Sequence, residues 1–235
     1  MKIAYDLHIH TALSPCGDDD MTPNNIVNMA VLKGLDVIAI TDHNTCRNAA
    51  ACIKCAESTD LLVLPGMEVE SAEECHIVCI FPNLDAALKM EEQVKAHLPK
   101  IKNRPDIFGH QAVMDEDDNI VEYEENLLVT ATTLSVDKVA ELALAFGGVA
   151  IPAHIDKSAY SVISNLGFID DSWGFKTVEV KDLSKADAMY DDKGLDRFAI
   201  IHSSDAHYLW DISEKEHFLE AEKLNAEVII NILGQ

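Results

Sequence analysis

Tyr5-Asp-Leu-His-Ile-His-Thr11 ends an apolar run and carries two histidines one residue apart. Side chains two residues apart in a strand share a face, so a strand from Lys2 to His10 points His8 and His10 the same way. An isolated His-x-His also fits a half-exposed polar strand face. The fold and the function therefore depend on whether similar polar clusters follow other strands.

Apolar runs and helical patterns alternate along most of the 235 residues, which indicates an α/β fold built on a parallel or barrel sheet. Thr22-Pro23 and Asn83 are typical helix starts, and glycines end two of the helices. We expect one domain over residues 1–235 with about seven core strands. After the first strand, these strands are predicted near residues 36–40, 61–64, 77–81, 149–151, 177–180 and 198–201.

The segment around residues 100–133 departs from this alternation. Residues 112–121 predict a hairpin with an acidic tip at Asp115–Asp118, which we interpret as an inserted flap. A loop of this length inside a compact domain is usually functional or mobile.

Four further polar clusters follow predicted strands: Thr41-Asp-His-Asn44, Pro65-Gly-Met-Glu68, Pro152-Ala-His154 and Ser203-Ser-Asp-Ala-His207. The carboxyl ends of barrel strands meet at one rim, so these clusters are predicted to converge. His76 reaches the same rim only if the strand at residues 77–81 runs antiparallel to its predecessor. Burying so many unpaired imidazoles and carboxylates is costly, and divalent cations remove that cost.

These motifs, from Asp6-Leu-His-Ile-His-Thr to Ser204-Asp-Ala-His, resemble the polymerase and histidinol phosphatase (PHP) family of metal-dependent phosphoesterases. The resemblance covers nearly the whole chain. It implies a distorted seven-stranded (β/α) TIM-like barrel with a trinuclear metal centre. The cofactors implied are three divalent ions, with zinc, manganese or iron suited to the mixed histidine and carboxylate ligands and magnesium possible.

The resemblance also implies a ligand set for each ion. The first ion would take His8, His10, Glu68 and Asp205; the second Glu68, His76 and His154; the third His43, His207 and a nearby acidic residue, for which Asp18 is preferred over Asp20. Asp6 and Asp42 fit better as acceptors of hydrogen bonds from ligand imidazoles.

The predicted reaction is phosphoester hydrolysis by a metal-bridging hydroxide held beside Glu68. The residues expected to take part in the chemistry are Glu68, Asp205, His207 and Asp42. Lys157, Lys181 and His110 are weaker candidates for substrate binding. A water on the third ion, His110 or Asp42 could protonate the leaving group. The substrate is expected to be a small phosphorylated metabolite or a short nucleotide.

Charge bears on the choice of substrate. The formal net charge of −23 predicts that long nucleic acid is a poor partner. Exonuclease or proofreading activity remains an alternative that needs a basic track for the strand. A non-catalytic metal-binding regulatory module and a metal-dependent amidohydrolase are two more interpretations of the same motifs, and the oligomeric state stays open.

The chain contains no apolar run of membrane-spanning length and no secretory pattern, so a cytoplasmic location without membrane contact is expected. Reduced thiols are then expected for the six cysteines. Cys52-x-x-Cys55 lies in a predicted helix, where packing is favoured over a zinc site shared with Cys75 and Cys79.

Overall fold

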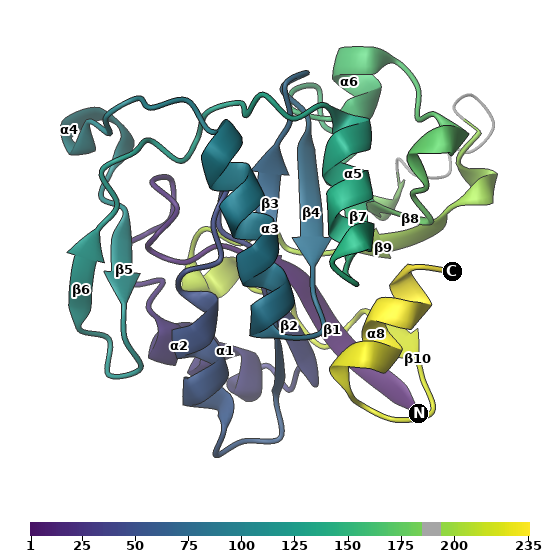
Figure 1. The fold of residues 1–235 in the computed structure, drawn as a ribbon. Coiled ribbons are helices and arrows are strands. Elements are labelled where there is room, and N and C mark those ends of the chain that lie inside the picture. The colour runs from purple at the N-terminus through teal and green to yellow at the C-terminus, as the bar shows by residue number, and fades with distance from the viewer. Residues whose placement is uncertain (185–193) are drawn as a thin grey trace.

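The computed structural model describes residues 1–184 and 194–235. Its main sheet has the strand order β10-β1-β2-β3-β4-β7, and two further pairs are β8–β9 and β5–β6. Figure 1 shows the main sheet curled, with helices α1, α2, α3 and α5 along its outer side. The strands are β1 (Lys2–Ile9), β2 (Val37–Ile40), β3 (Leu62–Glu70), β4 (His76–Ile80), β5 (Ala112–Met114), β6 (Ile120–Tyr123), β7 (Val149–Pro152), β8 (Thr177–Val180), β9 (Ala199–His202) and β10 (Phe218–Glu220).

The longer helices begin and end close to where the sequence predicts. Thr22 caps α1 by accepting a hydrogen bond from the Asn25 N–H, and Asn83 caps α3 through the Ala86 N–H. These caps satisfy amide groups that lack a partner within the helix. The helices are α1 (Pro23–Leu32), α2 (Ala49–Ala56), α3 (Leu84–His97), α4 (Pro105–Phe108), α5 (Val136–Ala145), α6 (Val162–Leu166) and α8 (Ala226–Leu233), with 3-10 turns η1 (Asp171–Trp173), η2 (Leu195–Arg197) and η3 (Leu209–Asp211).

Strand direction follows the prediction made for His76. β1, β2 and β3 are parallel, whereas β4 runs antiparallel to β3, with Glu70 opposite His76. The chain reverses in a tight turn in which the Ser71 N–H donates to the Cys75 carbonyl at 2.9 Å, and Glu74 adopts a left-handed conformation. The predicted antiparallel strand is therefore confirmed, and His76 returns to the rim.

The mixed α/β class is confirmed, with six strands in the curled sheet. The β8–β9 pair is linked to this sheet beside β7 and beside β1. The Ile155 N–H donates to the Glu179 carbonyl at 2.9 Å, and Ile9 forms a parallel bridge with Ala206. The exact count of seven strands in one barrel, and the single-domain boundary, stay predictions.

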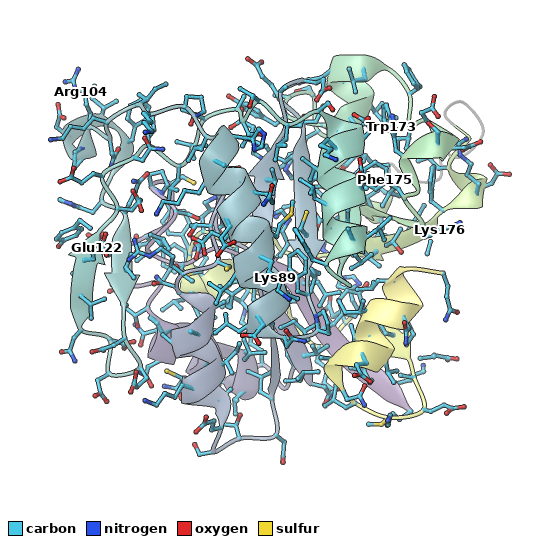
Figure 2. All side chains as sticks on the ribbon, in the orientation of Figure 1. Lys89, Arg104, Glu122, Trp173, Phe175 and Lys176 are labelled. Carbon is cyan, nitrogen blue, oxygen red and sulfur yellow. The ribbon has the colours of Figure 1, made fainter. Side chains whose placement is uncertain are left out.

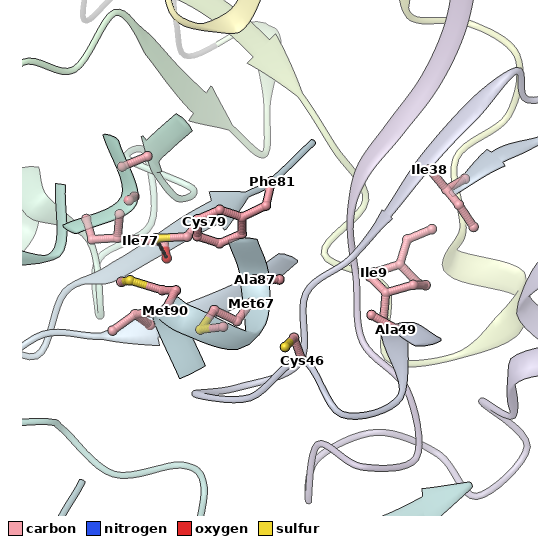
Figure 3. Packing of buried hydrophobic residues seen from close by; sticks show 14 of the residues in the cluster. Ile9, Ile38, Cys46, Ala49, Met67, Ile77, Cys79, Phe81, Ala87 and Met90 are labelled. Carbon is pink, nitrogen blue, oxygen red and sulfur yellow. Dashed lines mark hydrogen bonds between the residues drawn. The ribbon is translucent and has the colours of Figure 1, made fainter. Parts of the chain in front are cut away.

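Two apolar layers hold the sheet. The inner layer combines one face of the strands, including Leu7 and Ile151, with Ile229 and Leu233 of α8. The outer layer packs the opposite face against the helices, and Figure 3 shows part of it around Phe81, Met67 and Met90. Alternating side chains of each strand fill the two layers. The polar rim thus stands on a rigid support.

The cysteines of the Cys52-x-x-Cys55 motif contribute to the outer layer. Cys52, Cys75 and Cys79 are buried there, and Cys55 packs against it. This is the packing role expected for them.

The predicted hairpin forms from β5 and β6, and Figure 2 shows Glu122 at its outer edge. Its acidic tip is less free than expected, because Asp118 accepts hydrogen bonds from the Thr22 hydroxyl at 2.8 Å and the Asn24 N–H at 3.0 Å. The tip is therefore tied to the start of α1, and movement as a flap stays a prediction. Among the described residues, no helix has the length and apolar character needed to cross a membrane.

Candidate metal centre

Glu68 lies at the centre of the polar rim. It sits in β3, is 1% exposed, and its two carboxylate oxygens face five imidazoles. Oε1 is 2.9 Å from His76 Nδ1 and 3.3 Å from the Nε2 atoms of both His8 and His154. Oε2 is 3.0 Å from His43 Nδ1 and 3.5 Å from His10 Nε2. Segments distant in sequence thus meet at one carboxylate.

Asp205 supplies a second carboxylate on the side of β1. Its Oδ1 lies 3.5 Å from His8 Nε2 and 3.3 Å from His10 Nε2, and these two nitrogens are 3.1 Å apart. Asp205 and His154 both have positive φ angles, of 50° and 31°. Left-handed backbone is uncommon for residues other than glycine, and it is often found at functional sites. The turns after β7 and β9 are therefore shaped to aim these side chains.

The donor set fits bound cations. Three groups of ligand atoms converge within 4.8 Å, namely those of His8, His10 and Glu68, of His43, Glu68 and His76, and of His10, His43 and His207. Two buried atoms that face each other across the centre, His43 Nδ1 and Glu68 Oε2, have no hydrogen-bond partner of adequate geometry. Leaving buried polar atoms unpaired costs about 1–3 kcal/mol each, so ions that bind them would relieve a real penalty.

Electrostatics favours the ionised carboxylates. Burial alone would raise the pKa of Glu68, but the imidazoles of His76, His8 and His43 outweigh it and hold that pKa well below its usual range. The same balance lowers the pKa of Asp205, where burial is opposed mainly by His8 and His10. Both groups are thus available as anionic ligands at neutral pH.

Glu179 is a site residue that the sequence analysis missed. It points from β8, is 1% exposed, and its carboxylate lies 3.0 and 3.1 Å from His8 Nδ1. Its Oε1 also accepts the His154 N–H at 3.1 Å. A glutamate within the apolar strand Thr177-Val-Glu-Val180 was the available signal. Glu179 fixes the ring of His8 so that Nε2 faces the centre, as carboxylates behind metal-binding histidines do.

Asp42 reaches an imidazole through one hydroxyl. It accepts hydrogen bonds from the Ser14 hydroxyl at 2.7 Å and from the Thr11 N–H and hydroxyl, and Ser14 Oγ lies 2.9 Å from His10 Nδ1. Burial raises the pKa of Asp42 despite these hydrogen bonds.

Asp6 was expected to accept a hydrogen bond from a ligand imidazole, but within the described part of the chain its carboxylate accepts only from backbone groups. It accepts from the backbone N–H groups of Ser204 and Ser213 at 3.0 and 2.8 Å. Asp6 therefore fixes the loop after β9, which presents Asp205 and His207 to the rim.

Cys16 is the second residue that the sequence analysis missed. It lies beside His43 and His207, and burial would raise the pKa of its thiol. Hydrogen bonds with His207 and His43 prevail and lower that pKa to about 6.

Asp18, the predicted ligand, turns its carboxylate to the Asp20 N–H at 3.0 Å, while its own N–H donates to the His207 carbonyl at 2.9 Å.

The three candidate substrate-binding residues lie in different places. Lys157 reaches the centre, with Nζ 2.5 Å from Asp205 Oδ2. Lys181 donates to the Ser204 carbonyl, one residue before Asp205. His110 is exposed near the hairpin, where its ring lies 5.3 Å from that of Tyr123. Of the three, Lys157 is the one placed in direct contact with a candidate ligand.

The curled α/β sheet and its histidine and carboxylate rim are those of the PHP class of domain. The PHP domain family model matches residues 6–166, and the chain belongs to this family. An uncharacterized protein of Methanocaldococcus jannaschii is 36% identical over 100 residues, covering 38% of this chain and 58% of its own length. A 5'-3' exoribonuclease of Salmonella typhimurium is 34% identical over 88 residues, covering 36% of this chain and 29% of that enzyme. The chain thus matches only part of each curated relative.

Two solved structures share the fold at low identity. The lesion-specific endonuclease Q of Pyrococcus furiosus aligns with a TM-score of 0.71 at 20% identity, over 100% of this chain and 56% of that one. A candidate metal-dependent phosphoesterase of Bifidobacterium adolescentis aligns with a TM-score of 0.58 at 18% identity, over 97% and 95% of the two chains.

The prediction that long nucleic acid is a poor partner is wrong. An endonuclease Q complex, which aligns with a TM-score of 0.68 at 20% identity over 98% of this chain and 56% of that one, holds a 27-mer duplex with an abasic lesion at its active site. The physical error lies in using the charge of the whole chain. Charges are screened within about 10 Å at ordinary salt, so the field at the rim, with its imidazoles and Lys157, decides what binds there.

Proposed function

We propose that this chain hydrolyses phosphoester bonds at a cluster of divalent ions held by the rim. The observation that carries the proposal is Glu68, a buried carboxylate within 3.5 Å of five imidazoles. An apolar core has no use for such a group, and a simple structural metal site needs only four ligands. A rim with more donors than one ion requires fits a multinuclear centre.

We propose the division of ligands that the resemblance implies. His8, His10, Glu68 and Asp205 would hold one ion, Glu68, His76 and His154 a second, and His43 and His207, with Asp18 as a predicted further ligand, a third. Zinc, manganese or iron suits this set. When bound, such ions polarise phosphoryl oxygens and activate water at neutral pH.

The protein's own groups orient this centre. Glu179 holds His8, and Asp42 holds His10 through Ser14. Lys157 is the cation best placed to meet a phosphoryl oxygen, because its Nζ already lies against Asp205 at the rim. We infer that when Asp205 binds an ion, the Lys157 ammonium group leaves the Asp205 carboxylate and contacts a phosphoryl oxygen of the substrate. A Lys157→Met variant should then raise KM more than it lowers kcat.

A nucleotide or nucleic-acid substrate is supported by exposed rings beside the centre. Tyr160 is 50% exposed and stacks on His76, with ring centroids 5.0 Å apart. Tyr208 follows His207 directly, is 40% exposed and stacks on Trp210 at 5.0 Å. Exposed aromatic faces bind bases with about 1–3 kcal/mol each. Since one partial relative is an exoribonuclease, we favour a phosphodiester of this kind over a small phosphorylated metabolite.

The test is a Mn²⁺-supplemented screen of the purified chain. Its substrates are an aryl phosphomonoester, an aryl phosphodiester, 5'-labelled single-stranded RNA and DNA, and a duplex carrying an abasic site. His154→Gln should abolish turnover of whichever substrate is cleaved. His97→Gln, which alters a histidine on α3 outside the centre, should leave turnover unchanged. Equal activity of the His154 variant and the wild type would refute the proposal.

A further inference from the structure

We propose that a hollow beside the metal centre receives the base of the nucleotide that flanks the cleaved phosphodiester, with the Trp210 ring as its stacking surface. The inference rests on the proposed function, since it requires phosphodiester hydrolysis at the rim. It goes further because it assigns a binding site to a hollow whose described lining includes none of the predicted metal ligands.

The hollow has the size of a small-molecule site. Its volume is about 500 Å³, and such sites commonly measure about 300–1,000 Å³. It is lined by parts of the segment 204–217, by His202 at the end of β9, by Lys33 after α1 and by Lys181 after β8. A single nucleoside therefore fits within it.

The hollow and the metal centre share one wall. Ser204 lines the hollow and directly precedes Asp205, and Tyr208 directly follows His207. The ring of Tyr208 stacks on that of Trp210, which lines the hollow, with centroids 5.0 Å apart and planes 15° apart. A substrate held at the centre through its phosphodiester can therefore extend along these two rings into the hollow.

Trp210 is an exposed aromatic side chain on a fixed backbone. It is 70% exposed, although one face of its indole lies against Tyr208. Its carbonyl accepts a hydrogen bond from Lys33 Nζ at 3.1 Å, and the same ammonium group donates to the Ile212 carbonyl. Ile212 is 1% exposed, so this turn is anchored in the core. A ring fixed in this way loses little conformational freedom when a base stacks on it.

The charges around the hollow favour a base over a phosphate. Lys33 and Lys181 donate to backbone carbonyls, and Lys33 Nζ also lies 3.0 Å from Glu214 Oε1. The carboxylates of Asp211 and Glu216 line the hollow together with that of Glu214. Two lysines beside three carboxylates offer little attraction to an anion, whereas every base has a π face that can stack on an aromatic ring.

Two histidines provide hydrogen-bonding groups for the edge of a base. His202 and His217 line the hollow, and their ring centroids lie 4.4 Å apart. His202 Nδ1 is 3.1 Å from the Val180 carbonyl, so Nδ1 is the donor and Nε2 the acceptor of the neutral ring. The edges of bases carry both donors and acceptors, which match such a mixed polar lining.

The test compares aryl phosphodiesters that differ only in the base. The full chain with Mn²⁺ is given the p-nitrophenyl esters of thymidine 5'-phosphate and thymidine 3'-phosphate, and the matching esters of abasic deoxyribose phosphate. For the ester whose base reaches the hollow, the base should raise kcat/KM by roughly 5- to 150-fold. Trp210→Ala should remove most of this gain. Phe168→Ala is the matched control, because Phe168 is a 54% exposed ring stacked on Trp173 outside the hollow, and this variant should keep the gain.

Tryptophan fluorescence gives a second measurement that leaves the Trp210 ring unchanged. The chain has two tryptophans, so Trp210 is the single emitter in Trp173→Phe. A thymidine dinucleotide with a cleavage-resistant methylphosphonate link, added with Mn²⁺, should quench this emission, and its abasic analogue should not. The quenching should change little with salt concentration, because the neutral link releases no counterions.

The outcomes separate this inference from the function on which it rests. Equal kcat/KM with and without the base in the wild type, a base effect that persists in Trp210→Ala, or emission that the thymidine compound leaves unchanged overturns the base site and leaves the metal centre intact. Failure of the wild type to hydrolyse any of the aryl phosphodiesters overturns the proposed function itself.

Discussion

Replacing Glu179 by glutamine isolates the contribution of a group that touches no predicted ion. The carboxylate lies 3.0 and 3.1 Å from His8 Nδ1, and glutamine keeps its shape while removing the charge. A hydrogen bond to a charged group contributes about 1.5–3 kcal/mol and a neutral one about 0.5–1.5 kcal/mol. The difference is about 1–2 kcal/mol. We expect it to appear in the free energy of metal binding, because only the anionic carboxylate makes the His8 imidazole a stronger metal ligand.

At about 1.4 kcal/mol per tenfold change, metal affinity should fall roughly 5- to 30-fold. This range overlaps the ~10- to 100-fold losses typical when such orienting carboxylates are changed. The assay is a titration of the metal-free chain with Mn²⁺ or Zn²⁺ in competition with a chromophoric chelator. Glu220→Gln, an exposed glutamate of β10, is the matched control and should bind metal like the wild type.

Unchanged affinity in Glu179→Gln, measured beside Glu220→Gln, would refute the view that Glu179 acts through His8. A fall in thermal stability of the metal-free variant with unchanged affinity would point to a purely structural carboxylate. The two results are separated by measuring both quantities on each variant.

Three further outcomes are expected. A metal ion present at about 100 times its Kd should stabilise the fold by about 2.7 kcal/mol, which raises the Tm by roughly 5–11 °C for a chain of this size. A chelator should reverse this rise, and an unchanged Tm would mean that metal does not bind the native rim. Ile151→Ala, in the inner layer, should cost about 2–5 kcal/mol in urea unfolding, whereas Val121→Ala on the exposed edge of the hairpin should cost far less. In the metal-free protein, the rate of Cys16 alkylation should rise with pH with a midpoint of about 6, because the lowered pKa leaves the thiol ionised above that value. A midpoint near the ordinary ~8.5 would contradict the contacts with His43 and His207.

Much of the fold was readable because each signal is local. Apolar runs predicted the strands, Thr22 and Asn83 predicted helix starts, and the position of His76 before its strand required the reversal that β4 makes. Polar clusters at strand ends predicted that distant histidines would meet, since strand direction places those ends together. These predictions needed only periodicity and chain direction.

The residues that escaped prediction act through contacts between segments far apart in sequence. Glu179 stands in an ordinary apolar strand, and only the neighbouring positions of β8 and β1 place it behind His8, 171 residues away. Cys16 was passed over for the acidic residues that follow it, because nothing local shows that its thiol lies near His43 and His207.

The prediction drawn from the net charge failed for a different reason. A net charge of −23 is a sum over the whole surface, whereas binding at the rim depends on the groups within a Debye length of it. The sequence by itself determined which elements form and which polar side chains face one rim, since both follow from local pattern. The tertiary structure alone decided which groups orient those ligands and which thiol lies among them, because packing sets distances that sequence spacing does not contain.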